Sequence, residues 1–378
     1  MTEATPSGKG HVSVLTLKGF ADLSFTSADL DSMVRDLKSK GVASVGEVRI
    51  DENYFDNRGF PGSEGGFRQR LFNVSPLFLD HNEVEVVVTP GSSVGEKASV
   101  NLNPPVESVD CFGEVQTSQR GGKVSVHESE ASPTAFGLDV GGSIAIGAGP
   151  QTYRISCDDP GKVVGIRLLD DLRRNGISAP QDFSFGAAPK DGKVLVEKKS
   201  TSLGELLPII NKKSDNFLAE QLAKVLGAEY GGQPGSTEKG IQAILRELNA
   251  TGVDVKGIFL ENGSGLSRNT RVKAKTMVSA LQKVYDNPRL REQFMNSLSI
   301  LGVDGTLRKR FRGTDLAGRF VGKTGTLNGV TALTGFAFPN SGLGEKTYIL
   351  SHLVNGSGKG FWARKALTQQ ILELLLSQ

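Results

Sequence analysis

The sequence predicts an α+β protein in which a β-rich part precedes a mixed part, with the boundary near residues 158–161. Before that boundary, short apolar runs are broken by Gly, Pro and Asn, which is typical of successive strands. After it, longer runs have the period of a helix, and three strands follow near the end of the chain. We therefore expect β-rich domains over residues 1–160 and an α+β domain over residues 161–378.

Residues 1–160 contain one predicted helix among strands. Thr26 or Ser27 is its N-cap, its apolar residues recur at the spacing i, i+3, i+4, i+7, and Gly41 ends it. Those apolar residues are Leu30, Met33, Val34 and Leu37. The clearest predicted strands cover residues 45–50, 83–89, 123–126 and 153–157.

Residues 161–378 are predicted to be mostly helical up to about residue 297. A three-stranded meander then follows, and Asn328-Gly329 is expected to form a type I′ turn between its first two strands. A last amphipathic helix, about 360–376, should place Leu367, Ile371 and Leu374 on its apolar face. The expected helices before it cover residues 163–175, 203–211, 216–227, 237–249, 272–285 and 289–297, and the strands cover residues 319–326, 330–338 and 347–355.

The composition argues against several classes of protein. With 44 Lys and Arg against 41 Asp and Glu, the net charge of +3 is too small to indicate a nucleic-acid or membrane-surface partner. No window of about 18 apolar residues predicts a transmembrane segment, and the first ten residues of the chain as given contain no signal peptide. Cys111 and Cys157 lie in no metal-binding pattern, so we expect no metal and no cofactor. A disulfide and two separate thiols remain equally open.

Two short motifs are better explained by structure than by chemistry. Residues 322–324 resemble the end of a phosphate-binding loop, but the first glycine of that motif is missing and a strand pair follows. Ser236 and Lys239 form a Ser-x-x-Lys pattern in which a lysine could take the serine proton. An ordinary N-cap ahead of an amphipathic helix explains this pattern better.

A pair of polar triplets gives the strongest indication of function. Ser214-Asp215-Asn216 opens a predicted helix, and Lys323-Thr324-Gly325 lies on a strand just before a hairpin turn. Either triplet alone is weak, since Ser-x-Asn is expected by chance about once in such a chain. Their order along the chain and their positions on these elements together indicate a single site.

The residues of the second triplet suit a peptide that ends in a carboxylate. Lys323 supplies positive potential, and the hydroxyls of Thr324 and Thr326 can donate to the carboxylate. Gly325 has no side chain, so an extended peptide can pair with the strand.

The first triplet suits proton transfer and the holding of an amide. Ser214 can relay a proton, and the side chain of Asn216 can both donate to and accept from a substrate amide. We therefore expect a catalytic set and a substrate-binding set, which are Ser214, Asn216 and Lys323, and Thr324, Gly325 and Thr326.

At these residues the chain resembles the class C penicillin-binding proteins, the D-alanyl-D-alanine carboxypeptidase/endopeptidases of the S13 peptidase family. The resemblance covers nearly the whole chain. It also rests on Leu17-Lys18-Gly19 followed by residues 26–30, on residues 261–268 and on residues 302–307. The family implies a serine DD-peptidase/β-lactamase-like domain with inserted β-rich domains. It also implies peptidoglycan peptides ending in D-Ala as substrates, β-lactams as covalent inhibitors, and a periplasmic or extracytoplasmic location.

The sequence departs from the family pattern at the nucleophile. Family members carry a Ser-x-x-Lys ahead of the inserted domains, and no residue before Ser214 supplies one. Either the natural polypeptide starts further upstream and is a serine-type carboxypeptidase, or the chain is an inactive homologue that binds peptidoglycan peptides. We favour the first reading, because both remaining triplets are intact. A serine β-lactamase shares the triplets, but the long β-rich part argues against it.

Overall fold

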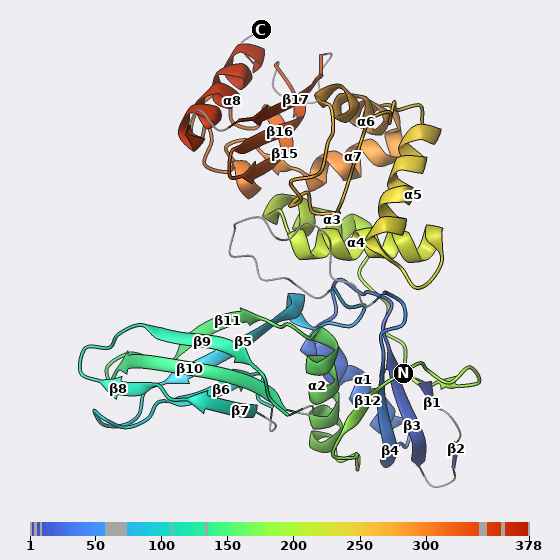
Figure 1. Ribbon diagram of the computed structural model, residues 1–378, viewed down its shortest axis with the longest axis vertical. Coiled ribbons are helices and arrows are strands. Elements are labelled where there is room, and N and C mark those ends of the chain that lie inside the picture. Colours follow the sequence, from blue (N-terminus) through green and yellow to red (C-terminus); the bar gives the residue numbers. More distant parts are fainter. Residues whose placement is uncertain are drawn as a thin grey trace. The chain divides into compact units, whose positions relative to one another are not determined.

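The chain forms two compact units in the computed structural model (Figure 1). The structure describes residues 2–3, 6–7, 10–56, 74–106, 109–132, 135–339, 346–356 and 360–376. Of these described residues, those up to Ser200 form unit 1 and those from Thr201 onward form unit 2. The described elements form several sheets with helices, so the α+β class expected from the sequence is confirmed.

The first part of unit 1 is a sheet with two helices. Its elements are β1 (Thr2–Glu3), β2 (Pro6–Ser7), β3 (His11–Lys18), α1 (Ser27–Ser39), β4 (Ser44–Asp51), α2 (Pro160–Arg174), β12 (Phe183–Phe185) and β13 (Lys193–Val194). The strand order is β12-β4-β3-β1-β13, and β2 pairs with β3. β3 and β4 run parallel, and α1 is the crossover between them, as parallel neighbours require.

Local sequence accounts for α1. Thr26 and Asp29 form a capping box in which each side chain accepts a hydrogen bond from the other residue's backbone N–H. Gly41 has φ +89°, a conformation that glycine adopts without steric cost, and it follows the helix end. Leu30, Met33, Val34 and Leu37 are all buried, so the predicted helix and its apolar face are confirmed.

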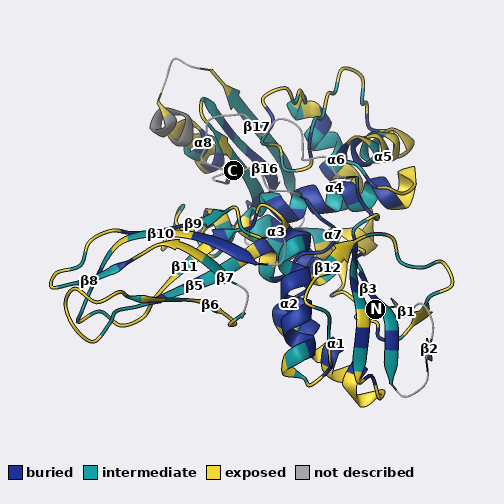
Figure 2. Cartoon of the chain, turned by 60° about the horizontal axis from the view of Figure 1, so that its bottom comes forward, coloured by how far each residue is buried: buried dark blue, intermediate teal, exposed yellow. Residues whose placement is uncertain are grey.

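α2 packs between two hydrophobic clusters of unit 1, and Figure 2 shows most of it as buried. Val164, Leu168 and Leu172 belong to the cluster around β3 and β4, whereas Ile166 belongs to the cluster of the β-rich sheets. The change of sequence pattern near residues 158–161 marks the start of this helix. The division between the units comes later, at Ser200 and Thr201, because α2 buries its side chains within unit 1.

The rest of unit 1 is β-rich, as its sequence predicts. It contains the short 3₁₀ turn η1 (Asp80–Asn82) and the strands β5 (Glu83–Thr89), β6 (Ser99–Asn103), β7 (Val109–Gly113), β8 (Gln116–Ser118), β9 (Val124–Ser129), β10 (Phe136–Ala145) and β11 (Gln151–Ser156). β11, β5 and β6 form one antiparallel sheet, and β7, β10, β8 and β9 form another. Cys111 on β7 is exposed and Cys157 after β11 is buried, and no disulfide joins these two described residues.

Unit 2 is an antiparallel sheet between helices (Figure 1). Its elements are α3 (Leu203–Lys213), α4 (Asn216–Gly231), α5 (Thr237–Ala250), α6 (Ala274–Asp286), α7 (Pro288–Ser297), β14 (Ser299–Ile300), η2 (Gly305–Leu307), β15 (Phe320–Leu327), β16 (Val330–Ala337), β17 (Tyr348–Asn355) and α8 (Phe361–Leu376). The strand order is β14-β15-β16-β17. Leu333 packs with α8 residues, while Phe336, which points to the other face, packs with residues of α6 and α7. None of the helices in these described ranges is long and apolar enough to cross a membrane.

Two local predictions for unit 2 are wrong. A type I′ turn needs a positive φ at both central residues, but only Gly329 has one, and the Asn328 carbonyl instead accepts a hydrogen bond from Arg268. In α8, Leu367 and Leu374 are exposed, and Thr368, Leu372 and Leu376 form the buried face. The end of α8 is rich in leucine around most of its circumference, so its sequence does not single out one apolar face.

Candidate active site

Ser214 lies at a tight junction between two helices. It is the C-cap of α3, with φ 58° and ψ 51°, and Asp215 immediately after it caps α4 by accepting a hydrogen bond from Leu218 N–H. The left-handed conformation is unfavourable for a residue with a Cβ atom, by about 1–2 kcal/mol. Strained residues of this kind cluster at functional sites, which draws attention to Ser214.

The substitution Ser214→Gly should separate this strain from the role of the hydroxyl. Both Ser214→Gly and Ser214→Ala remove the hydroxyl, but only glycine adopts φ 58° without steric cost. We expect the glycine variant to be more stable than the alanine variant by about 1 kcal/mol. The ratio of hydrogen-exchange rates in α3 and α4 measures the difference, and equal rates in the two variants would contradict the strain argument.

Lys323 meets Ser214 although the two are far apart in the sequence. On β15, the Lys323 Nζ atom donates to Ser214 Oγ at 2.5 Å and to the Thr324 carbonyl at 2.9 Å. Burial lowers the pKa of the Lys323 ammonium, because the charged form has lost solvation. The two triplets singled out in the sequence therefore share one site, in which a lysine with lowered pKa faces a serine hydroxyl.

The edge of β15 beside this lysine is open. β14 pairs with β15 only at Gly322 and Val321, so no other described strand pairs with that edge from Lys323 onward. On the opposite side, β16 continues to pair along the whole strand. Thr326 is exposed, and the position of a Gly325 Cβ would be 3.3 Å from the Ala332 Cβ, so glycine also avoids a close contact there. An extended peptide can pair with this free edge.

Asn216 is the first residue of α4 and is half-buried. Its side-chain amide has no hydrogen-bond partner among the described residues of the chain. The amide is thus available to a ligand through both a donor and an acceptor.

A model of the D-Ala-D-Ala carboxypeptidase 3 (S13) family matches residues 1–376. The chain belongs to this family. It is 31% identical over 352 residues to D-alanyl-D-alanine carboxypeptidase of Actinomadura sp. (strain R39), covering 88% of this chain and 65% of that protein. It is 27% identical over 359 residues to D-alanyl-D-alanine carboxypeptidase DacB of Haemophilus influenzae, covering 92% of this chain and 72% of that protein. The chain thus spans about two thirds of the length of the Actinomadura relative.

Solved structures agree with the fold of this S13 family member. Penicillin binding protein 4 (dacB) from Haemophilus influenzae superimposes with a TM-score of 0.79 and 23% identity, over 100% of this chain and 85% of that one. Its complex with a β-lactam gives a TM-score of 0.75. The serine DD-peptidase fold with inserted domains, expected from the resemblance, is therefore confirmed.

Thr306 contacts β15 through the side chain of Thr324, and the sequence did not reveal this contact. Thr324 Oγ1 donates to Thr306 Oγ1 at 2.9 Å, and Thr306 N–H donates to Ser299 Oγ at 3.1 Å. Lys212 at the end of α3 forms an ion pair with Asp304 at 2.6 Å. Asp304 and Thr306, at the start of η2, therefore connect the helix that carries Ser214 with the strand that carries Lys323.

A buried glutamate on α4 organises the loop that follows α5. Glu220 is fully buried, and its carboxylate accepts hydrogen bonds from Gly263 N–H at 3.0 Å and Ser264 N–H at 2.9 Å. Burial raises the pKa of this carboxyl, and these hydrogen bonds oppose the rise. Arg268 from the same loop donates a hydrogen bond to the Asn328 carbonyl in the β15–β16 turn, at 2.6 Å. Nothing in the local pattern around Glu220 indicates these long-range contacts.

The Ser-x-x-Lys pattern at Ser236 is a helix cap, as expected. Ser236 is the N-cap of α5, and its Oγ accepts a hydrogen bond from Lys239 N–H. The Lys239 ammonium donates to the carbonyls of Gly232 and Pro234, each at 2.7 Å. Both side chains are therefore engaged in local structure.

Proposed function

We propose that the chain carries the substrate groove and proton-relay residues of a serine-type D-alanyl-D-alanine carboxypeptidase/endopeptidase that acts on peptidoglycan stem peptides. One observation carries the proposal, namely the hydrogen bond from Lys323 Nζ to Ser214 Oγ beside the open edge of β15. The names of the Actinomadura and Haemophilus relatives support the same activity. A peptidoglycan substrate implies a periplasmic or other extracytoplasmic location.

In this proposal the substrate pairs with β15 as an added strand. The free edge from Lys323 to Thr326 offers backbone groups to an extended peptide. The Lys323 ammonium neutralises the terminal carboxylate and the Thr326 hydroxyl donates to it. The Thr324 hydroxyl donates to it when it gives up its hydrogen bond to Thr306. The Asn216 amide holds a peptide group further along the substrate. A cavity of about 690 Å³ beyond the strand end, lined by Arg268 and Arg271, leaves room for an anionic part of the stem peptide.

The reaction proposed is acyl transfer to a serine. The serine oxygen attacks the carbonyl carbon of the penultimate D-Ala, the C–N bond breaks, and the terminal D-Ala leaves with a proton on its amine. Water then hydrolyses the ester. Lys323 and Ser214 suit the proton transfer to the leaving amine, because the lowered pKa of Lys323 brings its neutral and charged forms closer in free energy. The family resemblance assigns the attacking serine to a Ser-x-x-Lys pair.

A second function, peptide binding without acyl transfer, has one observation in its favour. Ser236 and Lys239, which form a Ser-x-x-Lys pattern, are both engaged in hydrogen bonds at the start of α5 and so do not serve as a nucleophile and its base. In a binding protein, the groove along β15 would hold the same D-Ala-terminated peptide and release it unchanged.

Labelling and peptide binding distinguish the two functions. Fluorescent penicillin and a diacetylated peptide ending in Lys-D-Ala-D-Ala, with a free or an amidated C-terminus, are offered to the protein expressed from its own gene. We expect covalent labelling and release of D-Ala, and at least ~10-fold weaker binding of the peptide with an amidated C-terminus. Peptide binding without label identifies the binding function. Absence of both activities contradicts both functions, and rapid turnover of a cephalosporin identifies a β-lactamase.

A further inference from the structure

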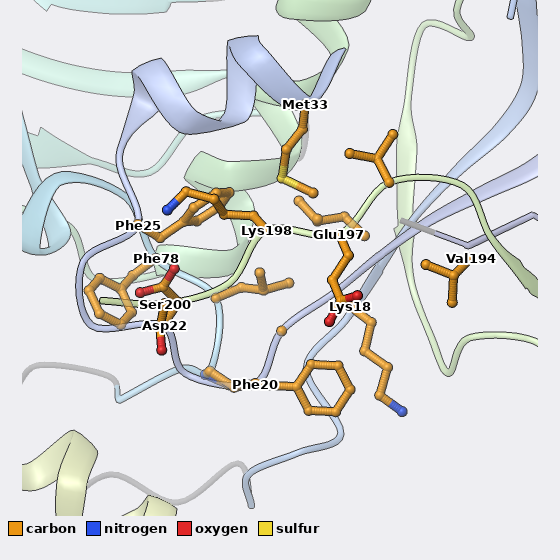
Figure 3. Close-up of a pocket in the computed structure, with 15 residues that line it drawn as sticks. Lys18, Phe20, Asp22, Phe25, Met33, Phe78, Val194, Glu197, Lys198 and Ser200 are labelled. Atoms are coloured by element: carbon orange, nitrogen blue, oxygen red, sulfur yellow. The ribbon is translucent and has the colours of Figure 1, made fainter. Parts of the chain in front are cut away.

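A second cavity lies wholly within unit 1 and shares no lining residue with the candidate active site. Its volume is about 570 Å³, within the range of small-ligand sites. Figure 3 shows its lining side chains, which come from four segments that are distant in the sequence. They are Leu17, Lys18, Gly19, Phe20, Asp22 and Phe25 around the end of β3, Met33 of α1, Pro76–Phe78, and Val194, Val196, Glu197, Lys198 and Ser200 after β12.

Contacts with α1 and its C-cap hold one wall of the cavity in place. Lys40 Nζ donates to the Leu195 carbonyl at 2.5 Å, and Lys198 forms an ion pair with Asp29 at 3.4 Å. Both contacts fix residues 195–200 against α1. In the opposite wall, Ala21 has φ 58°, a strained conformation for alanine that orients the residues on either side of it. The cavity is therefore formed by anchored segments.

The interior is apolar, with aromatic rings at several points. Phe25 and Phe78 are buried, whereas Phe20 at the rim is 59% exposed and makes an edge contact with Tyr54, with the ring centroids 5.5 Å apart. An exposed phenylalanine at the mouth of an apolar cavity can cover a bound apolar group. Lys18 lies over the same ring, 5.4 Å from its centroid.

The charges at the cavity are unbalanced. Lys18 is paired with Asp51 at 3.5 Å, and Lys198 is paired with Asp29. Asp22 Oδ1 accepts hydrogen bonds from Ser24, but its Oδ2 atom is buried and has no partner among the described residues. Glu197 is exposed and pairs with no described Lys or Arg. Asp22 and Glu197 therefore leave net negative charge at the cavity wall, because Lys18 and Lys198 are already paired with other carboxylates.

We propose that this cavity binds a short peptide whose apolar side chain lies next to a free ammonium group. The apolar walls favour an aromatic or aliphatic side chain. The negative charges of Asp22 and Glu197 at the cavity wall favour a cation, and the Phe20 ring at the rim adds a cation–π contact. The site is independent of the acyl-transfer groove.

Three matched dipeptides test this proposal on the full chain. Phe-Leu-amide carries a free ammonium, N-acetyl-Phe-Leu-amide is neutral, and N-succinyl-Phe-Leu-amide is anionic. Dissociation constants come from calorimetry or ligand-observed NMR. We expect the cationic peptide to bind at least ~10-fold more tightly than the neutral one, and the anionic peptide to bind most weakly. Equal affinities, tightest binding of the anionic peptide, or no binding of the cationic peptide at about 5 mM overturns the proposal.

Variants then locate the site. Asp22→Asn keeps the oxygen that accepts from Ser24 but removes the charge, so the preference for the cation should fall below ~3-fold. Phe20→Ala removes a largely exposed ring and should weaken every peptide that binds, the cationic peptide most, without unfolding the chain. Asp182→Asn, an exposed carboxylate that does not line the cavity, is the matched control and should change nothing. A cation preference that survives Asp22→Asn contradicts the proposal. Binding should also survive Lys323→Met, so this test and the test of the proposed function fail separately.

Discussion

Replacing Lys323 with methionine is expected to lower the affinity for a peptide ending in D-Ala-D-Ala by ~100-fold or more, and the rate of acylation by at least as much. Methionine keeps the length of the apolar stem but removes the ammonium that donates to Ser214 Oγ. Lys323 is half-buried, so the loss of its charged donor from the substrate carboxylate is costly because water replaces it only in part. Peptide calorimetry and penicillin-labelling rates measure the two effects.

The fold should survive this substitution. Burial lowers the pKa of the Lys323 ammonium, so the charged form is not a strongly stabilised feature of the folded chain. The matched control is Lys309→Met, because Lys309 is an exposed lysine of the same unit. We expect the control to bind the peptide like the native chain. If Lys323→Met kept more than a third of the native affinity and labelling rate, the groove along β15 would not be the substrate site.

The pairing of the two triplets could be inferred from the sequence because each carries a local signal. Ser214–Asn216 precede a helix, and Lys323–Gly325 lie on a strand before a turn. Neither local pattern indicates the long-range hydrogen bonds that hold the two triplets and their neighbouring loops in place. Thr306 and Glu220 act through hydrogen bonds to residues distant in the sequence, and a threonine in a short turn or a glutamate on a helix is common in many contexts. The unit 1 cavity is similar, because it forms only when four separate segments fold together.

The fold was predictable where one signal dominated. α1 has a capping box, a single apolar face and a terminal glycine, and all three agree. α8 ends in a run rich in leucine, so its periodicity did not decide which face is buried, and the packing against β16 decides it instead. The Asn328-Gly329 turn is likewise determined by a tertiary contact, the hydrogen bond from Arg268. Local propensity gives way wherever a specific long-range contact competes with it.

A large effect on stability is also expected from Asp171, whose carboxylate is buried in α2. Asp171 is fully buried, forms an ion pair with Arg174, and keeps one oxygen without a hydrogen-bond partner among the described residues. Loss of solvation raises its pKa from 3.8 to about 6, despite the opposing effect of Arg174. The folded chain thus binds this proton more tightly than the unfolded chain does.

The sign of the pH dependence follows from linkage. Because the folded-state pKa is the higher one, the stabilising contribution is complete below about pH 4 and is lost as the pH rises through about 6. A rise of about two units corresponds to about 3 kcal/mol. Asp171→Asn carries no titrating proton, so its stability relative to the native chain should increase by about 3 kcal/mol between pH 4 and pH 7.5. Hydrogen exchange of α2 amides measures this, and the variant-to-native rate ratio should fall ~100-fold over that range.

Comparing variant and native rates at each pH removes the intrinsic pH dependence of exchange. Because only α2 amides are followed, the measurement reports on unit 1 alone, which matters because the two units need not unfold together. Asp182→Asn serves again as the control, since an exposed carboxylate gains no stability from neutralisation. A rate ratio for Asp171→Asn that stayed constant from pH 4 to pH 7.5 would mean that Arg174 fully compensates the buried charge. In that case the α2 core would tolerate the carboxylate without penalty, and the raised pKa would be wrong.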